Sequence, residues 1–145
     1  MPIARPEVTI TGKRVIRKKS KIAGAGFGVF GCEPFTKNTR IVNYDGQIIS
    51  PSTSDWRERR YQKKGMIWCF TVNRRKVRDG NVGGNIARFI NHSCKPNCYS
   101  QVVKDTVWIR AGRNIKKGEE LTYDYNTGGE AGIQCYCRKG CKNKI

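Results

Sequence analysis

The sequence predicts a mainly β protein made of several short strands and one helix. Three observations carry this prediction: the apolar runs are short, glycines separate them, and no long helices alternate with them. Such alternation would mark a doubly wound nucleotide-binding fold, which this pattern does not match. With 145 residues, of which 37% are hydrophobic, the chain is long enough to form one domain with a buried core.

Most of the chain has the pattern of strands and turns, with glycine and proline marking the breaks. The expected elements are, in order, apolar runs broken by glycine over 8–35, two strands over 40–50 with a turn at Asp45-Gly46, a strand over 66–72, a short helix over 85–90, one strand over 102–109, and a strand after a turn at Gly118. The first seven residues are expected to form a loose arm.

The segment from Ser52 to Gly65 has the pattern of the one longer helix. Ser54 is the expected N-cap, because a serine hydroxyl can accept a hydrogen bond from a free amide of the first turn. Asp55 would lie at the positive end of the helix dipole, and Gly65 would end the helix.

The charge of the chain is strongly unbalanced. Lys and Arg number 29 against 11 Asp and Glu, which gives a net charge of +18. An excess of this size predicts a polyanionic neighbour, either nucleic acid or a substrate carried on nucleic acid. No apolar run approaches the roughly 20 residues of a membrane-spanning helix, and the N-terminus lacks the apolar stretch of a secretory signal.

The seven cysteines are unevenly placed, and without an export signal they do not suggest a disulfide framework. Cys32 and Cys69 stand alone beside apolar residues, so we expect them to be buried core thiols. The remaining cysteines form two groups, Cys94 with Cys98 and a C-terminal group of three. Clusters of this kind in an intracellular protein are typical of metal ligands.

Two loops combine residues that could bind a ligand. In Gly24–Gly28 the alternating glycines allow close approach of a ligand to the backbone, although a plain tight turn explains them equally well. The segment Ala87–Cys98 holds the sole histidine among Asn, Ser and Cys. This segment is interpreted as a ligand-binding loop, with a capped structural turn as the alternative.

A third segment, Gly118–Tyr125, carries two tyrosines at i and i+2. On a strand, this spacing places Tyr123 and Tyr125 on the same face. The pair is either a buried aromatic contact or the lining of a narrow channel that presents hydroxyls to a cation.

Taken together and in this order, GFG, RFINHSCKPN and EELTYDY closely resemble the signature of SET-domain protein lysine methyltransferases, and the C-terminal cysteines are similar to the family's zinc-binding post-SET segment. The resemblance runs from about Lys13 to Cys141. It implies a SET-domain fold of several small sheets, with a knot-like crossing near the active site and a short zinc-bound C-terminal segment. The implied organisation is an N-terminal arm at 1–12, a SET domain at 13–127 and a post-SET segment at 128–145.

The resemblance also implies a cofactor site for S-adenosylmethionine. The family's GxG turn contacts the cofactor through its backbone, its Asn-His pair holds the other side, an arginine braces this region, and the post-SET segment closes over it. The matching residues here are Gly26, Phe27, Gly28, Arg88, Asn91, His92 and Tyr136.

The implied catalytic tyrosine is Tyr125, which would orient a lysine amine toward the transferred methyl group. Tyr123 stands where the family has Phe or Tyr, and a tyrosine there leaves less room for added methyls, which implies mono- or dimethylation. Tyr44 matches a tyrosine near the lysine channel. Trp68 stands where many members have Tyr, so we assign it no polar cofactor contact.

Four thiolates of Cys94, Cys135, Cys137 and Cys141 would form a closed structural Zn²⁺ site. The sequence departs here from the family pattern, because three residues rather than four separate Cys137 from Cys141. Cys98 is therefore a possible substitute ligand. The chain also has no cysteine-rich segment before the core, so we expect either a complete minimal enzyme or a trimmed form of a longer one. A freestanding form would suggest a bacterial, archaeal or viral protein, or one that acts on a host's chromatin.

The implied function is methylation of a lysine in a histone tail or another basic, nucleic-acid-associated protein. A basic face would then dock on DNA or a nucleosome, with no membrane contact; it comprises Arg57, Arg59, Arg60, Lys63, Lys64, Arg74, Arg75 and Lys76. The expected location is intracellular: chromatin for a eukaryotic or host-directed protein, and otherwise the cytoplasm. The alternatives are an inactive SET-fold module that binds nucleic acid or chromatin, and a plain zinc-stabilised nucleic-acid binder, which would leave GEELTYDY unexplained.

Overall fold

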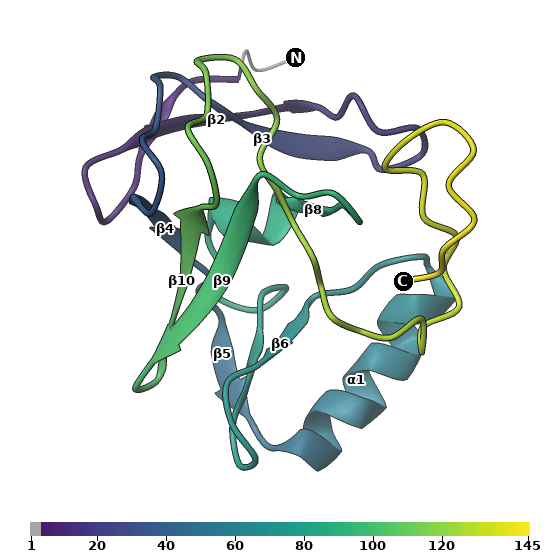
Figure 1. The fold of residues 1–145 in the computed structure, drawn as a ribbon. Coiled ribbons are helices and arrows are strands. Elements are labelled where there is room, and N and C mark those ends of the chain that lie inside the picture. The colour runs from purple at the N-terminus through teal and green to yellow at the C-terminus, as the bar shows by residue number, and fades with distance from the viewer. Residues whose placement is uncertain (1–3) are drawn as a thin grey trace.

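Four small β-sheets, one α-helix and one 3₁₀-helix make up residues 4–145, the part of the chain that the computed structural model describes (Figure 1). The prediction of a mainly β fold is confirmed. The elements are β1 (Glu7–Val8), β2 (Arg14–Lys19), β3 (Phe27–Gly31), β4 (Arg40–Asn43), β5 (Gln47–Ile49), α1 (Pro51–Lys63), β6 (Cys69–Thr71), β7 (Val77–Asp79), η1 (Ile86–Phe89), β8 (Asn91–His92), β9 (Cys98–Val103), β10 (Thr106–Ala111) and β11 (Thr122–Tyr123). Within 4–145, no helix is both long and apolar enough to span a bilayer.

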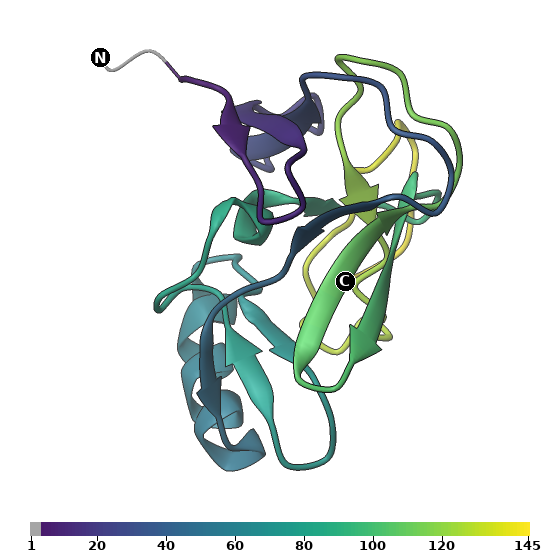
Figure 2. The same ribbon diagram turned by 90° about the vertical axis from the view of Figure 1, so that its left-hand side faces the viewer.

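Three of the sheets are antiparallel, with strand orders β1-β2-β3, β4-β10-β9 and β5-β7-β6, and the fourth is the parallel pair β8-β11. Figure 2 shows the β1-β2-β3 sheet at the top of the molecule and α1 with its sheet at the bottom, beside the long β9–β10 hairpin. The core lies between them. It includes Val15, Val29, Ile41, Ile109 and Leu121, all fully buried.

The helix forms where the sequence predicts it, but its N-cap was wrongly assigned. Ser50, not Ser54, caps α1, and its Oγ accepts a hydrogen bond from the Thr53 amide. Pro51 fits the first helical position, because the fixed φ of proline suits it and no amide hydrogen is lost there. Ser54 is buried in the first turn instead. Gly65 follows the helix with φ of +74°, as expected of a glycine that ends one.

Two strand predictions need correction or refinement. The single strand expected over 102–109 is wrong, because the chain turns at Lys104 with φ of +56° and forms the β9–β10 hairpin. No glycine marks that turn, which is why the pattern concealed it. The two strands expected over 40–50 exist, but β4 pairs with β10 and β5 with β7, so they belong to different sheets.

Two further expectations differ from the structure. The solitary thiols of Cys32 and Cys69 are half-buried rather than enclosed in the core. In the expected N-terminal arm, Glu7–Val8 pairs with β2 as a short strand, while residues 1–3 lie outside the described residues. The domain boundaries inferred from the family resemblance stay predictions.

The parallel pair β8-β11 joins two segments that are distant in the sequence. Asn91 lies opposite Thr122, and His92 lies opposite Tyr123. The buried Asn97 extends the pair, because its Oδ1 accepts from the Thr122 amide at 2.9 Å and its Nδ2 donates to the Glu120 carbonyl at 2.8 Å. The segment that contains β8 and the segment that contains β11 therefore lie side by side, as the knot-like crossing of the SET-domain fold requires.

A buried carboxylate attaches α1 to the sheet beneath it. Asp79, fully buried at the end of β7, accepts hydrogen bonds from Arg57 Nη1 at 2.9 Å and from the Tyr61 hydroxyl at 2.7 Å. The Asn81 amide donates to its other oxygen at 2.9 Å. A buried charge is tolerated when it is paired and hydrogen-bonded in this way.

We expect Asp79→Ala to lower the free energy of unfolding by about 3 kcal/mol, because the change leaves Arg57 without its buried partner. Asp105→Ala is the matched control, since Asp105 pairs with Lys76 on the surface and its loss should cost about 1 kcal/mol or less. Urea unfolding of both variants measures the difference. Equal losses would contradict the anchoring role of Asp79.

Candidate functional site

Two cavities meet at Tyr125. The larger, of about 650 Å³, lies between the glycine loop, η1 and the C-terminal segment. The smaller, of about 400 Å³, lies between α1, β6 and the segment after β11. Of residues 4–145, Ile67 and Tyr125 alone line both cavities. The Tyr125 side chain can therefore contact a ligand in either cavity.

An aromatic cluster forms the wall of the smaller cavity. The ring centroids of Tyr44 and Phe70 are 5.5 Å apart, those of Phe70 and Tyr123 are 6.1 Å apart, and those of Tyr123 and Tyr125 are 4.9 Å apart. β11 ends at Tyr123, yet the two tyrosines still pack against each other. The predicted tyrosines are thus brought together on one wall.

The three hydroxyls of this wall differ in their partners. Tyr44 donates to the Trp68 carbonyl at 2.5 Å, and Tyr125 donates to the Ile90 carbonyl at 2.6 Å. The hydroxyl of Tyr123, a side chain only 4% exposed, has no hydrogen-bond partner within 4–145. Because no fully enclosed side-chain polar atom of that range lacks a partner, this hydroxyl must open into the cavity.

All three phenols are neutral at physiological pH. Burial raises the pKa of Tyr44, Tyr123 and Tyr125, and the proximity of Tyr125 adds to the rise for the other two. The hydroxyl hydrogens of Tyr44 and Tyr125 are already engaged in hydrogen bonds to carbonyls. The oxygens of these two hydroxyls can therefore only accept hydrogen bonds from a ligand. The wall can orient an amine but provides no phenolate base.

His92 connects this wall to the cysteine cluster. Its Nδ1 accepts a hydrogen bond from the Tyr125 amide at 3.0 Å, which places the ring proton on Nε2. Nε2 lies 3.5 Å from Cys94 Sγ. Burial lowers the pKa of His92, and the Asp124 carboxylate offsets only part of this effect. The neutral ring thus fixes the backbone of Tyr125.

The glycine loop forms one side of the larger cavity. Gly24 and Gly26 have φ of +72° and +71°, a conformation that side chains rarely allow. Asn91 Nδ2 donates to the Phe27 carbonyl at 2.8 Å, so the loop and the Asn-His segment are directly joined. Gly26, Phe27, Asn91 and His92 all line the cavity.

Glu120 holds this loop in place, a role that the sequence did not reveal. Its carboxylate accepts from the Ser20 hydroxyl at 2.7 Å, the Lys21 amide at 2.8 Å and Asn91 Nδ2 at 3.2 Å. Gly28 does not line the cavity. It faces Glu120 instead, and a Cβ at this position would collide with the carboxylate.

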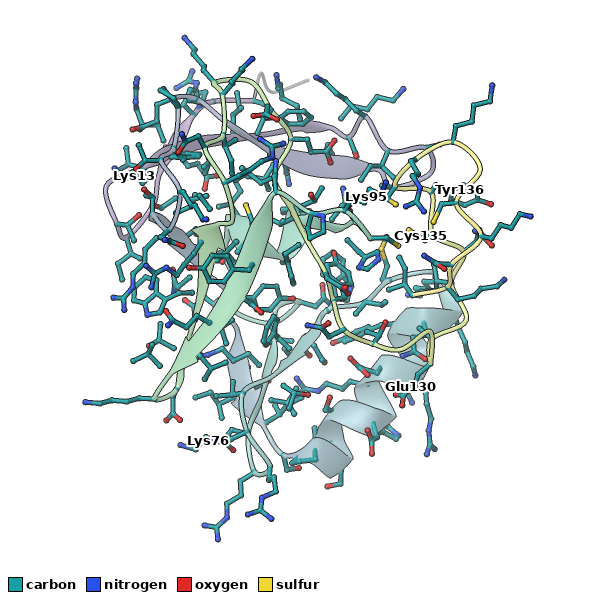
Figure 3. The ribbon with its side chains drawn as sticks, in the orientation of Figure 1. Lys13, Lys76, Lys95, Glu130, Cys135 and Tyr136 are labelled. Carbon is teal, nitrogen blue, oxygen red and sulfur yellow. The ribbon has the colours of Figure 1, made fainter. Side chains whose placement is uncertain are left out.

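Aromatic and cationic side chains complete the larger cavity. The Arg88 guanidinium lies 4.6 Å from the Phe89 ring centroid and 5.7 Å from that of Trp68, and the two rings meet edge to face at 6.2 Å, so all three pack together along this cavity. Tyr136, 56% exposed, approaches from the C-terminal segment, and Figure 3 shows it beside Cys135. Trp68, to which the sequence assigned no polar contact, contributes an apolar face.

The four predicted thiols form one cluster, with Sγ atoms of Cys94, Cys135, Cys137 and Cys141 within 4.8 Å of one another. Cys94 Sγ is 3.8 Å from Cys135 Sγ and 3.9 Å from Cys141 Sγ. Tetrahedral Zn²⁺ with Zn–S bonds of about 2.3 Å requires S···S separations of about 3.8 Å. The donor set therefore fits zinc.

The surroundings of this cluster favour a thiolate at Cys137 and oppose one at Cys135, whose pKa burial raises to about 12. Asn143 Nδ2 donates to Cys94 Sγ at 3.2 Å. Burial opposes ionisation of Cys137, but hydrogen bonds from the Cys94 backbone and the neighbouring thiols lower its pKa. Cys98, the possible substitute ligand, is buried on β9 and is not part of the cluster. The shortened spacing thus still allows the four cysteines to meet.

Sequence reasoning missed several residues of the site. Glu120 lay within a quoted motif without a role, and Ser20 had no motif at all. Ile67 borders both cavities, but nothing in the sequence around an isolated apolar residue indicates that it lines a cavity. Their contacts arise from the tertiary structure, so one sequence alone could not have identified them.

Comparison with known proteins agrees with this geometry. The sequence matches the SET domain family over residues 26–126. The H3 lysine-4 specific histone-lysine N-methyltransferase of Schizosaccharomyces pombe (strain 972 / ATCC 24843) is 41% identical over 117 residues, which cover 76% of this chain and 13% of the relative. Histone-lysine N-methyltransferase 2D of Homo sapiens is 38% identical over 120 residues, covering 77% of this chain and 2% of the relative.

A solved structure of ctPRC2 in an autoinhibited conformation bound to S-adenosylmethionine is similar, with a TM-score of 0.71 and 29% identity, over 79% of this chain and 15% of that one. Chaetomium thermophilum Polycomb Repressive Complex 2 bound to GSK126 aligns with a TM-score of 0.72 and 28% identity, over 79% of this chain and 16% of that one. This chain spans a small part of each relative.

Proposed function

Since this chain belongs to the SET-domain family, we propose that it transfers methyl groups from S-adenosylmethionine to a lysine side chain of a protein. The position of Tyr125 carries the proposal, because one side chain lines both cavities. The larger cavity would hold the cofactor, and the smaller would admit the lysine. The solved relative bound to S-adenosylmethionine supports this assignment of the cofactor.

S-adenosylmethionine would supply an electrophilic methyl group on a sulfonium: a neutral lysine nitrogen would bond to the methyl carbon as its bond to sulfur breaks, and S-adenosylhomocysteine would leave. The chain must therefore favour the loss of a proton from an ammonium whose ordinary pKa is about 10.4. The aromatic wall of the buried Tyr44 and Tyr123 and the partly buried Phe70 desolvates the ammonium and lowers this pKa. The proton leaves to solvent, because the phenols are no bases.

The chain's own part in catalysis is positioning. The Tyr44 and Tyr125 oxygens accept from the amine hydrogens and align the nitrogen lone pair, while Asn91 and the glycine loop hold the cofactor side. His92 fixes the backbone of Tyr125. Rate enhancement would thus come from orientation and desolvation, without a nucleophile on the enzyme.

We propose a histone tail, or another basic chromatin protein, as the substrate, and hence chromatin in the nucleus as the place of action. The relatives named as histone-lysine N-methyltransferases support this class. The proposal concerns the class of substrate and does not name the lysine that is methylated. The Tyr123 hydroxyl, which projects into the smaller cavity, favours mono- or dimethylation over trimethylation, because it occupies room that further methyl groups would need.

Zn²⁺ is the metal that we propose for the four-thiolate cluster. It would tie the C-terminal segment with Tyr136 to Cys94 and would thereby hold the larger cavity closed. The ligand set has no open position, so its role is structural.

A polyanion contact by the basic face is part of the proposal, with one correction to its members. Arg57 is engaged with Asp79 and Gln47, and Lys76 is engaged with Asp105. Arg57 thus holds a buried carboxylate, and Lys76 belongs to a surface ion pair. The exposed members are Arg59, Arg60, Lys63, Lys64, Arg74 and Arg75. They would bind phosphates of nucleosomal DNA, and salt would weaken that contact.

Incubation with labelled S-adenosylmethionine is expected to label a lysine in free histones, and more so in nucleosomes at low salt. Tyr125→Phe is the control, and it should lower the rate at least a hundredfold while cofactor binding persists, because orientation of the amine is lost (about 3 kcal/mol). Mass spectrometry identifies the labelled residue. Absence of label with cofactor still bound would contradict the enzyme and favour a binding module.

In the same assay, Tyr123→Phe is expected to shift the products toward the trimethylated lysine, because it removes the hydroxyl that occupies the cavity. The total rate of transfer should stay within about tenfold of the unchanged protein. The distribution of methylated peptides by mass spectrometry measures the shift. An unchanged distribution would overturn the role of Tyr123.

We expect about one zinc per chain by elemental analysis, in keeping with a single four-thiolate site. Removal by a chelator, or Cys137→Ser, should speed amide hydrogen exchange in residues 128–145 and weaken cofactor binding, since Tyr136 is no longer held. Cys98→Ser should leave the metal content unchanged. Loss of zinc in Cys98→Ser, or its retention in Cys137→Ser, would refute the ligand set.

A further inference from the structure

The smaller cavity has a charge opposite to that of the whole chain. Three carboxylates line it, those of Glu58, Asp124 and Glu130, whereas none of the lysines or arginines does. Over the full chain, 29 basic residues outnumber 11 acidic ones. The cavity that borders the tyrosine wall is thus anionic in a cationic protein.

Glu58 and Glu130 face this cavity from different elements. Glu58 lies on α1, and Glu130 lies in the segment that follows β11; Figure 3 shows Glu130 beside α1. Neither carboxylate takes part in an ion pair within residues 4–145, where Arg57, the neighbour of Glu58, is engaged with Asp79. Burial raises the pKa of Glu58, as do the charges of Asp55, Asp79 and Glu130, and a hydrogen bond with Cys69 offsets only part of this rise. The described residues thus supply no cation to balance the repulsion between these carboxylates.

The third carboxylate is not compensated either. Asp124 Oδ1 lies 3.6 Å from His92 Nδ1, but this nitrogen accepts the Tyr125 amide hydrogen and therefore has no hydrogen to donate to the carboxylate. Uncompensated carboxylates around one cavity attract a cation.

An independent observation shows that the cavity is open to a polar ligand. The buried Tyr123 side chain presents a hydroxyl without a protein partner to the same cavity. A metal ion does not fit the acids, since within residues 4–145 the four cysteines alone bring three or more ligand atoms close enough to share one. A larger organic cation that spans the cavity fits them.

We propose that Glu58 and Glu130 bind a second basic side chain of the protein substrate, preferably an arginine, next to the target lysine. The inference rests on the proposed function and adds a substrate preference to it. A guanidinium presents donors on two sides and can engage both carboxylates, which an ammonium does less well. The target lysine occupies the tyrosine wall, and its basic neighbour lies toward α1.

This assignment also accounts for how a protein of charge +18 accepts a basic substrate. The outer surface repels such a chain, and the anionic cavity gives it one attractive place to bind. The attraction between partly exposed charges should fall as the ionic strength rises, because the Debye length shortens from about 10 Å at 0.1 M salt to about 3 Å at 1 M.

The test uses the full chain, S-adenosylmethionine and peptides with one lysine, in which each position within three residues of that lysine is in turn arginine or glutamine. The unchanged protein should prefer arginine at one of these positions by about tenfold in kcat/KM, and the preference should shrink at high salt. In Glu58→Gln and Glu130→Gln it should fall to about threefold, and in the double variant to about onefold.

The rate on the glutamine peptide is the internal control, because a folded variant should keep it. Glu7→Gln removes the same charge from the exposed β1, far along the chain from the cavity, and should keep the full preference. A preference that is absent in the unchanged protein, or that survives in the double variant, overturns the inference.

Peptide affinity, measured by fluorescence anisotropy with S-adenosylhomocysteine present, separates this inference from the proposed function. Tighter binding of the arginine peptide that disappears in the double variant supports the inference even if no methyl group is transferred, in which case the proposed function fails. Methyl transfer without any preference supports the function and overturns the inference. Equal affinities of both peptides, without transfer, overturn both.

Discussion

The short parallel pair between β8 and β11 is the constraint on which the rest of the site depends. It sets His92 against the segment of Tyr123 and Tyr125, and the Asn97 side chain extends it by bonding the Thr122 amide and the Glu120 carbonyl. From this pair the chain continues to Cys94 and thus to the C-terminal thiols. The β8-β11 pair, with two residues in each strand, therefore positions the tyrosine wall, the glycine loop and the cysteine cluster. A shift in the register of this pair would displace all three.

Burial and charge act together around Tyr125. The phenols are held neutral by burial, so the wall offers oriented oxygens rather than a base. The acids lie beyond this wall, at the smaller cavity, and the exposed basic residues lie on the outer surface. A substrate that combines a basic tail with a polyanion, as chromatin does, complements both. The separation of the two charges thus reconciles the net charge of +18 with the basic substrate that we propose.

Much of the site could be predicted from the sequence, because its residues cluster in motifs. Tyr125, the Asn91-His92 pair and the four cysteines are recognisable because they match the motifs of the SET-domain family, and the structure brings the cysteines together. The features that were predicted wrongly or missed are of two kinds. In some, the local sequence offers two equally suitable residues or lacks a marker, and in others the contact joins residues that are distant in the sequence. Ser50 and Ser54 are both suitable caps, and Pro51 decides between them. The turn at Lys104 lacks a glycine, and the contacts of Glu120 span a hundred residues. Local patterns do not encode such contacts.

In the proposed mechanism, Tyr125 separates a cofactor cavity from a lysine cavity. A crystal structure of the chain with S-adenosylhomocysteine and a lysine peptide would show whether it does. We expect the cofactor product against Trp68 and Tyr136 in the larger cavity, and the lysine side chain along Tyr44 and Tyr123 in the smaller, with its amine at the Tyr125 hydroxyl. Both ligands in one cavity, or a lysine bound away from Tyr125, would contradict it.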